Sequence, residues 1–407
     1  MFTGPNISQN GLVFAFDSGY GMDTNHTRLR YNQGEPTTNI IYAGNTTLNN
    51  GVYWTNSGTG NYNNNDVSTD KPKIPQVNTS GLQMMSGETI VVGSQHVGCA
   101  GFTGAASTTY TISVYFRQNR AGSNQPYFRT NVNNNSLGNF NYKGDTNAAN
   151  WPVNEWIRIS CTATLQSNET GGYLSNYIGS EVGDKIWYFA PQVEQKSHAT
   201  PFALGTRSHT QGVLDGSGNA IMDTSLTSFD AYGRPVFDGT NDYIPITTFP
   251  NKPSTAITCE GWCKPTKGTV SGTIRGGVLS ASNSMYLGII NSVDGTTHAM
   301  HWANQTSNNR AYNWNGSVPD NQWAHLVGTY DGSTARAYVN GVEISNWSQT
   351  GTITTSTTYY VGTYGGGLTD GIHNFNGLIG TALIYNRALS ATEVLKHYEA
   401  GKNRFKN

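Results

Sequence analysis

The chain has 407 residues and a formal net charge of −1, and only 12% of its residues are charged. A nearly neutral chain has no long-range field that would steer it to nucleic acid or anionic lipid, so we exclude both as partners. Its 48 glycines and 11% aromatic residues, with a surplus of Asn, Thr and Ser, are typical of an all-β protein with many turns.

The N-terminal residues MFTGPNISQNG lack the basic and apolar regions of a secretory signal peptide. No run approaches the ~18 apolar residues of a membrane span, so we expect no membrane insertion. The 4 cysteines are too few for a disulfide scaffold. We therefore expect synthesis in a cytoplasm.

The first predicted element is a half-buried strand. Residues 11–21, GLVFAFDSGYG, alternate apolar and polar side chains for the length of one strand and then break at Asp17-Ser18-Gly19. From about Tyr31 the composition changes, so the sheet to which this strand belongs has to be identified from more distant residues.

The stretch from about Glu35 to Arg207 contains strands of its own. Residues 108–117, TTYTISVYFR, alternate Tyr and apolar residues with Thr and Ser, and residues 154–166 repeat this pattern. The stretch opens on PTTNII and closes on residues 185–207, KIWYFAPQVEQKSHATPFALGTR. These patterns predict a separate antiparallel sandwich.

From Val213 onward, short strands alternate with turn signals. Asn340-Gly341, between two alternating segments, predicts a two-residue type I′ hairpin, and Asp331-Gly332 predicts another turn. Cys259 and Cys263 lie four residues apart on a predicted strand, hence ~13 Å apart, too far for a disulfide. We expect both to be core residues of a second sandwich.

One short helix is predicted near the C-terminus. In LSATEVLKHYEAGKNRF, Ser390 and Glu393 form a capping box. Apolar residues at helical spacing follow, and Gly401 ends the helix.

The C-terminal segments resemble the laminin-G-like, concanavalin A-like jelly-roll domains. The motifs are FDGTNDYI (237–244), the strand with Trp262, WAHLVGTYDG (323–332), YVNGVEI, and FNGLIGTALIYNRALSATEV (375–394). They cover roughly 190 residues in the expected order. In one feature the chain departs from the family pattern. An acidic pair often follows the motif FxGxI in the family, whereas Gly380 and Thr381 occupy these two positions here.

The resemblance implies that the first strand belongs to this C-terminal sandwich. Such domains usually begin with a strand like GLVFAFD, followed shortly by a segment like VLDGSGNA, which occurs here only at 213–220. We therefore expect a second domain inserted at a surface turn. The expected divisions are 1–34 (arm and first strand), 35–207 (insert), 208–401 (rest of the sandwich) and 402–407 (tail).

The insert resembles carbohydrate-binding-module-like jelly rolls. Its closing segment, with Gln192, Glu194, Pro201 and Arg207, resembles one found in structural proteins of tailed bacteriophages. The predicted fold class is therefore all-β: two antiparallel β-sandwiches (jelly rolls), one inserted into the other, with a short C-terminal helix.

Catalytic motifs are scarce. Glycoside hydrolysis needs two carboxylates ~5 to 9 Å apart, whereas the glutamates are scattered, and Glu260 beside Trp262 is the only one placed where a cleft is conceivable. No nucleophile elbow or zinc-protease motif occurs, and His298 and His301 fall on opposite faces of a strand. We expect no enzyme, with glycan hydrolysis as the least favoured alternative.

Calcium is the only cofactor we consider. Asp238, Asn241 and Asp242 offer oxygen ligands for part of a hard-cation site, and some laminin-G-like domains bind calcium. Alternatively, Asp238-Gly239 makes a turn that Asp242 caps. We favour the turn because Gly380 and Thr381 lack carboxylates.

Sugar recognition needs aromatic faces beside amides and hydroxyls. Residues 301–316, HWANQTSNNRAYNWNG, combine them, and so do residues 53–65, YWTNSGTGNYNNN. We expect Tyr312 and Trp314 on a loop or rim, although packing beneath loops is the alternative. The candidate sugar-binding residues are Trp302, Tyr312, Asn313, Trp314, Tyr53 and Trp54.

We therefore expect a non-enzymatic structural protein on the surface of a bacteriophage virion, assembled in the host cytoplasm. It would be a decoration, head-fibre or tail-fibre protein, with other virion proteins and host or environmental glycans as partners. The alternative is a purely architectural capsid or tail subunit. The sequence lacks sustained heptads, so any homo-oligomer must form through the sandwiches or through a partner that holds residues 1–10.

Overall fold

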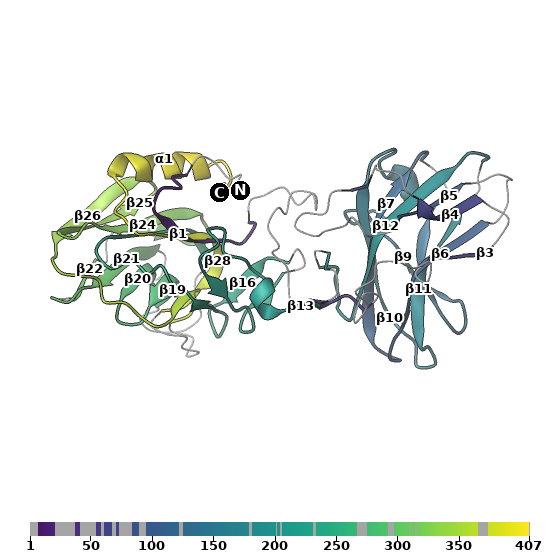
Figure 1. The fold of residues 1–407 in the computed structure, drawn as a ribbon, viewed down its shortest axis with the longest axis horizontal. Coiled ribbons are helices and arrows are strands. Elements are labelled where there is room, and N and C mark those ends of the chain that lie inside the picture. Colours follow the sequence, from purple (N-terminus) through teal and green to yellow (C-terminus); the bar gives the residue numbers. More distant parts are fainter. Residues whose placement is uncertain are drawn as a thin grey trace. The chain divides into compact units, whose positions relative to one another are not determined.

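In the computed structural model the chain forms two units, Met1–Glu35 with Ser208–Asn407 (unit 1) and Pro36–Arg207 (unit 2). Each unit is built of antiparallel sheets, which confirms the predicted fold class (Figure 1). The structure describes residues 7–20, 37–40, 54–57, 61–66, 71–72, 84–88, 95–121, 125–178, 181–200, 202–203, 206–230, 233–266, 275–291, 297–308, 310–313, 316–364 and 373–406.

Unit 1 is a sandwich of two eight-stranded sheets. In sheet 1 the order is β15 (Ser228–Phe229), β16 (Pro235–Asp238), β28 (Asn376–Tyr385), β18 (Ile257–Pro265), β24 (Ala324–Tyr330), β25 (Thr334–Val339) and β26 (Val342–Ser348), and β1 (Leu12–Asp17) also pairs with β28. In sheet 2 the order is β14 (Ile221–Met222), β17 (Ile244–Thr248), β27 (Tyr359–Val361), β19 (Arg275–Ala281), β20 (Met285–Asn291), β21 (Thr297–Gln305) and β22 (Arg310–Asn313), and β23 (Ser317–Pro319) also pairs with β21.

The opening strand β1 belongs to unit 1, as expected. It pairs antiparallel with β28, with Phe16 opposite Ala382. Its other side is held by residues about two hundred positions downstream, because Asp215 Oδ1 accepts the Ala15 N–H at 2.7 Å and the Gly216 N–H donates to the Ala15 carbonyl at 2.8 Å. Phe14 and Phe16 are fully buried in the unit 1 core. The first strand therefore completes a sandwich whose other strands follow the insert.

Strand β18 separates two environments by alternation. Cys259 and Cys263 face the core between the sheets, are fully buried and form no disulfide, so their predicted role as core residues is confirmed. Burial raises the pKa of both thiols. Glu260 and Trp262 face the other way, under the C-terminal helix α1 (Ala391–Gly401). The predicted capping box is confirmed, since the Ser390 hydroxyl accepts the N–H of Glu393. The predicted hairpin joins β25 to β26, with positive φ at Asn340 and Gly341.

Unit 2 contains two five-stranded sheets around its own core. Sheet 3 has the order β10 (Ile157–Thr164), β7 (Thr109–Gln118), β12 (Lys185–Glu194), β5 (Met84–Glu88) and β4 (Asn61–Asp66). Sheet 4 has the order β3 (Trp54–Ser57), β6 (Gln95–Thr103), β11 (Gly171–Ile178), β8 (Pro126–Thr130) and β9 (Ser136–Asn139). Short 3₁₀ turns lie at Ala148–Asn150 in this unit and at His209–Gln211 in unit 1.

The two ends of the insert meet within unit 2. Strands β2 (Thr37–Thr38) and β13 (Thr206–Arg207) pair antiparallel. The buried Glu194 carboxylate joins this pair to β12, since it accepts the Thr37 hydroxyl at 2.7 Å and the Thr200 N–H at 3.0 Å. Adjacent ends are the geometry that an insertion into a surface turn requires. Within the described part of the chain, no helix has the length and apolar character needed to cross a membrane.

Candidate functional site in unit 1

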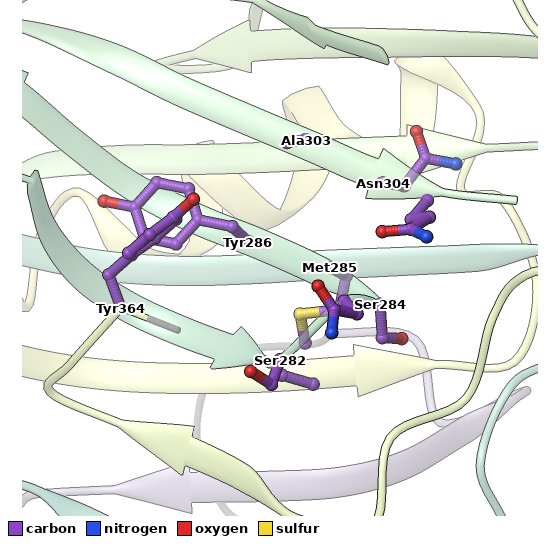
Figure 2. Close-up of a pocket in the computed structure, with 10 residues that line it drawn as sticks. Ser282, Ser284, Met285, Tyr286, Ala303, Asn304 and Tyr364 are labelled. Atoms are coloured by element: carbon purple, nitrogen blue, oxygen red, sulfur yellow. The ribbon is translucent and has the colours of Figure 1, made fainter. Parts of the chain in front are cut away.

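A pocket of about 150 Å³ lies on sheet 2 where the β19–β20 hairpin meets the end of β21 (Figure 2). The hairpin turn is tight, because the Ser284 N–H donates to the Ala281 carbonyl at 3.1 Å and Asn283 adopts a positive φ. The Gln305 N–H donates to the Ser284 carbonyl at 2.7 Å and fixes the hairpin against β21. We call this the hairpin pocket; its lining residues are Ala281, Ser282, Asn283, Ser284, Met285, Tyr286, Ala303, Asn304, Gln305 and Tyr364.

Two tyrosines form an aromatic corner of the hairpin pocket. The rings of Tyr286 and Tyr364 meet edge to face, with centroids 4.5 Å apart and planes at 81° (Figure 2). Tyr286 is held in place because its hydroxyl lies 2.9 Å from the Gly276 carbonyl oxygen, and Tyr364 stacks on His373 at 5.3 Å. Tyr286 is buried and Tyr364 is partly exposed. The partly exposed ring is therefore the one available to a bound molecule.

Asn304 supplies the polar side of the pocket. Its side chain is 1% exposed, and neither the amide nitrogen nor the amide oxygen has a hydrogen-bond partner among the described residues. Its backbone carbonyl is occupied, since it accepts Gln349 Nε2 at 3.1 Å. Buried amides in folded proteins almost always have partners, which are often ordered water or a ligand. The partner of the Asn304 amide would therefore be ordered water or a bound molecule.

The hairpin pocket carries no formal charge. Its lining consists of serine, asparagine, glutamine and tyrosine beside alanine and methionine. Such a surface offers hydrogen bonds and apolar contact but no ion pairing. It therefore selects against charged ligands, because a buried charge without a partner is strongly disfavoured.

The predicted sugar-binding stretch 301–316 contributes Ala303, Asn304 and Gln305 to the lining of this pocket. Trp302, expected as a sugar-binding residue, is fully buried in the unit 1 core. The side chains of β21 alternate between the two faces of the sheet, and Met300 and Trp302 point into the core. The polar residues between them in sequence made this stretch look too polar for a core strand. Tyr312 was expected on a loop and lies in β22, opposite Ala303 of the pocket.

The remaining sugar-binding candidates are not tested. Asn313 lies in β22, opposite Trp302, and Trp54 lies in β3, but the side chains of Trp54, Tyr312 and Asn313 are outside the described part of the structure. Tyr53 and Trp314 lie outside the described residues altogether. These side chains stay predictions. Sequence reasoning missed Tyr286 and Tyr364 as pocket residues, because they are far apart in sequence. The local signal for the pocket was the Ser-Asn-Ser sequence at 282–284, which is typical of a turn.

The candidate calcium residues serve a turn. Asp238 Oδ1 accepts the N–H groups of Thr240 at 2.7 Å and Asn241 at 3.2 Å. The buried Asp242 accepts the N–H of Ser228 at 2.8 Å and that of Asp238 at 3.2 Å. No group of three or more His, Cys, Asp or Glu side chains in the described parts of the chain is arranged to hold a metal ion. Calcium binding stays an untested sequence hypothesis.

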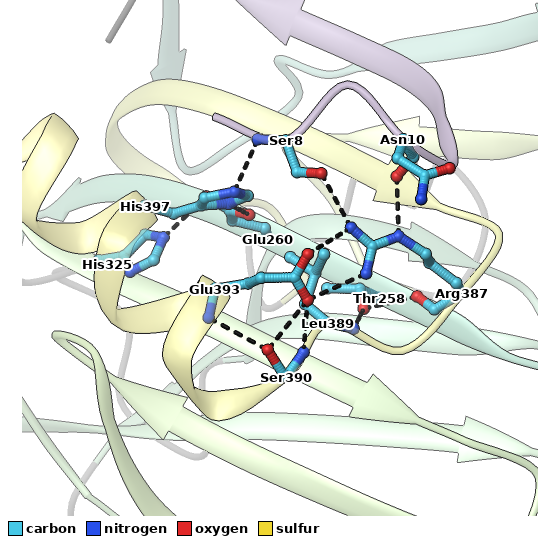
Figure 3. Close-up of polar contacts among 10 residues, drawn as sticks. All are labelled: Ser8, Asn10, Thr258, Glu260, His325, Arg387, Leu389, Ser390, Glu393 and His397. Atoms are coloured by element: carbon cyan, nitrogen blue, oxygen red, sulfur yellow. Dashed lines mark hydrogen bonds and ion pairs between the residues drawn. The ribbon is translucent and has the colours of Figure 1, made fainter. Parts of the chain in front are cut away.

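Glu260, the one glutamate that had been considered for a cleft, is 2% exposed. His325 Nε2 and His397 Nδ1 lie 2.9 and 2.8 Å from its two carboxylate oxygens (Figure 3). Burial by itself would raise the pKa of Glu260, but these hydrogen bonds outweigh burial and hold that pKa at about 2. A buried carboxylate that both histidines occupy is not positioned to protonate a glycosidic oxygen.

Part of unit 1 is similar in sequence to a known family. Residues 238–395 match the concanavalin A-like lectin/glucanases superfamily model for laminin-G-like domains. The match covers less than half of the chain. No curated protein sequence matches the chain.

Solved structures with similar folds have low identity. Domain 4 of AbnA, an extracellular arabinanase from Geobacillus stearothermophilus solved in complex with arabinotriose, is 18% identical with a TM-score of 0.34, covering 48% of this chain and 93% of that one. The receptor-binding domain of botulinum neurotoxin type G is 19% identical with a TM-score of 0.34, and 47% of this chain aligns with about half, 49%, of that one. A pentraxin from Limulus polyphemus is 18% identical with a TM-score of 0.29, covering 39% and 78%. At these TM-scores the likeness carries no functional argument, and the similarity to the lectin/glucanase superfamily rests on residues 238–395.

Proposed function

We propose that the chain is a non-enzymatic glycan-binding protein and that the hairpin pocket holds one neutral sugar ring. The observation that carries the proposal is the buried Asn304 amide, which has no partner among the described residues and lines a pocket with a tyrosine corner. The lectin/glucanase family match over residues 238–395 supports the same class of ligand.

The pocket's size and chemistry define the ligand further. A cavity of about 150 Å³ can bind benzene, and the hairpin pocket has about that volume, so we propose that it receives a single ring and not an oligosaccharide. A sugar hydroxyl both donates and accepts, so two adjacent hydroxyls can satisfy both atoms of the Asn304 amide. The apolar face of the ring would lie against Tyr364. The absence of charge from the lining favours neutral sugars over uronic or sialic acids.

A binding role is favoured over hydrolysis. The pocket lining contains no carboxylate, whereas hydrolysis requires two. Glu260 is held by His325 and His397 on the other sheet of unit 1. We therefore propose that the protein retains its ligand and releases no reducing sugar from it.

The test is glycan-array binding of the chain and of Asn304→Leu. The substitution removes both amide hydrogen-bonding atoms while keeping a similar volume, and it costs the fold no hydrogen bond to a described side chain. Loss of two hydrogen bonds of ordinary net strength should weaken binding roughly tenfold to a hundredfold.

Asn346→Leu is the matched control, because Asn346 is an exposed residue of β26 on the opposite sheet. The control should bind as the unmodified chain does. Equal binding by both variants, or no binding of any neutral glycan, would contradict the proposal and favour an architectural role.

We further propose that the protein is displayed on a bacteriophage particle, as a decoration or fibre protein with other virion proteins as partners. Support comes from the resemblance of residues 185–207 to a closing segment of tailed-phage structural proteins. Cryo-EM of the source particle would test this proposal: density for the two units on the virion surface would support it, and their absence from the particle would refute it.

A further inference from the structure

Strands β10, β7 and β12 lie side by side in sheet 3 of unit 2 (Figure 1), and one face of them alternates between basic and aromatic side chains. Arg158 of β10 lies opposite Tyr115 of β7, and Arg117 of β7 lies opposite Trp187 of β12. Lys185 precedes Trp187 by two residues and therefore shares its face. The apolar residues between them in sequence point into the unit 2 core. We call these five residues the basic face.

An aromatic ring positions each of the three cations of the basic face. The guanidinium of Arg158 lies 5.9 Å from the centroid of the Tyr115 ring, and that of Arg117 lies 5.1 Å from the Trp187 ring. The Lys185 ammonium lies 5.3 Å from the same indole. An arginine that stacks on a ring uses its flat face and keeps the N–H groups at its edge for other partners. All three cations are partly exposed, so a molecule from solvent can reach them.

The described carboxylates of unit 2 do not neutralise this face. Arg158 donates to the Ser113 hydroxyl at 2.9 Å, and neither Arg158 nor Lys185 forms an ion pair with a described side chain. Glu88 lies opposite Lys185 in register, but its side chain is outside the described part of the structure, so the argument rests mainly on the arginines. Other carboxylates of the unit have partners that do not belong to the basic face: Asp145 accepts from Asn147 and Asn150, Glu169 from Val132 and Asn133, and Glu194 from Thr37 and Thr200, while Glu181 and Asp184 pair with Arg120.

A strip of hydroxyl groups continues the basic face along β10. Ser160, Thr162 and Thr164 follow Arg158 at every second residue and so point to the same side of the sheet. Ser160 is partly exposed, and the two threonines are exposed. Each threonine hydroxyl has one partner on β7 and has room for another, because a hydroxyl offers one donor and two acceptor positions. From Arg158 to Thr164 the strand extends about 20 Å.

We propose that the basic face binds an acidic polysaccharide through the carboxylates of its uronic-acid residues. A carboxylate matches the planar fork of a guanidinium and accepts two parallel hydrogen bonds from it. Hydroxyl groups of the same polysaccharide would pair with the strip on β10, which offers neutral donors and acceptors. Nucleic acid fits this surface less well, because its denser charge calls for a longer basic stripe and the chain has a net charge of −1.

This ligand differs from the one proposed for unit 1. The lining of the hairpin pocket carries no charge, whereas the basic face selects for negative charge. Asn304→Leu should therefore leave the binding of an acidic polysaccharide unchanged, and the two proposals can fail independently.

Calorimetric titration of the full chain with polygalacturonate tests the basic face. The fully methyl-esterified polymer is the matched ligand control, since it keeps the sugar backbone and lacks the charge. The unmodified chain should bind the acidic polymer and not the ester. The affinity should fall as the salt concentration rises from about 50 to about 300 mM, because salt screens interactions between exposed charges.

Two substitutions locate the site. Arg117→Gln and Arg158→Gln should each weaken binding roughly tenfold, the factor expected for loss of a hydrogen bond to a charged group. Both residues are partly exposed, so the circular dichroism spectra should not change. Arg129→Gln is the matched control, because Arg129 of β8 also lies 5.9 Å from a tyrosine ring, that of Tyr127 in sheet 4. The control should bind as the unmodified chain does.

Three results would overturn the proposal. The first is equal affinity of the unmodified chain for polygalacturonate and for its methyl ester. The second is unchanged binding of polygalacturonate by both glutamine variants. The third is binding of single-stranded oligothymidylate or polyglutamate at least as tight as that of polygalacturonate, which would mean that the surface responds to charge alone.

Discussion

Replacing Phe16 with alanine should destabilise a sandwich whose other strands lie some two hundred residues away in sequence. Phe16 is fully buried in the unit 1 core, and its strand is hydrogen-bonded to β28 and to Asp215–Gly216. Truncation of a buried phenylalanine to alanine costs about 3–5 kcal/mol, because it removes apolar contacts and leaves a cavity. The free energy of unfolding of unit 1 should fall by that amount and that of unit 2 should not change.

Native-state hydrogen exchange can follow the two units separately. In Phe16→Ala, exchange of the central unit 1 strands β18 and β24 should accelerate, while exchange of β7 and β12 in unit 2 should stay the same. Phe116→Ala is the matched control, since Phe116 is fully buried in the unit 2 core, and it should give the opposite pattern. Acceleration of β7 and β12 in Phe16→Ala, or no change in either unit, would refute the assignment of β1 to unit 1.

Other substitutions test the core and the buried carboxylate. Gly328→Ala should destabilise unit 1 by about 1–3 kcal/mol through overpacking, because an added Cβ would lie 2.2 Å from Trp302 Cδ2. An unchanged denaturation midpoint would contradict the burial of Trp302. The pKa of Glu260 is lowered from 4.5 to about 2, so its ionised form stabilises the fold above about pH 4.5 and this contribution disappears as the pH falls towards 2. Urea unfolding should therefore show a steeper loss of stability over that window for the unmodified chain than for Glu260→Gln, and parallel slopes would argue against the buried network. Cys259 and Cys263 should resist thiol reagents until the chain unfolds, and rapid labelling of either one in native protein would be inconsistent with their place in the core.

Features determined by neighbouring residues could be predicted from the sequence. The hairpin at Asn340-Gly341 and the capping box of Ser390 and Glu393 depend on residues close in sequence, and both occur as predicted. The pairing of β1 is not local, and it was predicted only because the segment that usually follows such a strand is found at residues 213–220.

The candidate site was harder to predict because it is assembled by tertiary packing. Trp302 is buried because Gly328 on the facing sheet leaves room for the indole, and nothing near Trp302 in sequence indicates this. Tyr286 and Tyr364 meet because β27 and β20 both pair with β19, which brings distant segments together. Asn304 belongs to the stretch with the predicted sugar-binding composition, but only the folded chain shows that its amide has no hydrogen-bond partner among the described residues.

The central claim is that unit 1, completed by β1, is a self-sufficient glycan-binding module. Residues 36–207 can be replaced by a linker of about four residues, because paired residues at the ends of the insert lie only ~5 Å apart and Thr37 pairs with Arg207. On a glycan array, this shortened chain should fold and bind the same neutral sugars as the full chain, and Asn304→Leu should weaken that binding roughly tenfold to a hundredfold. A shortened chain that is unfolded, or that is folded but binds none of them, would contradict the claim.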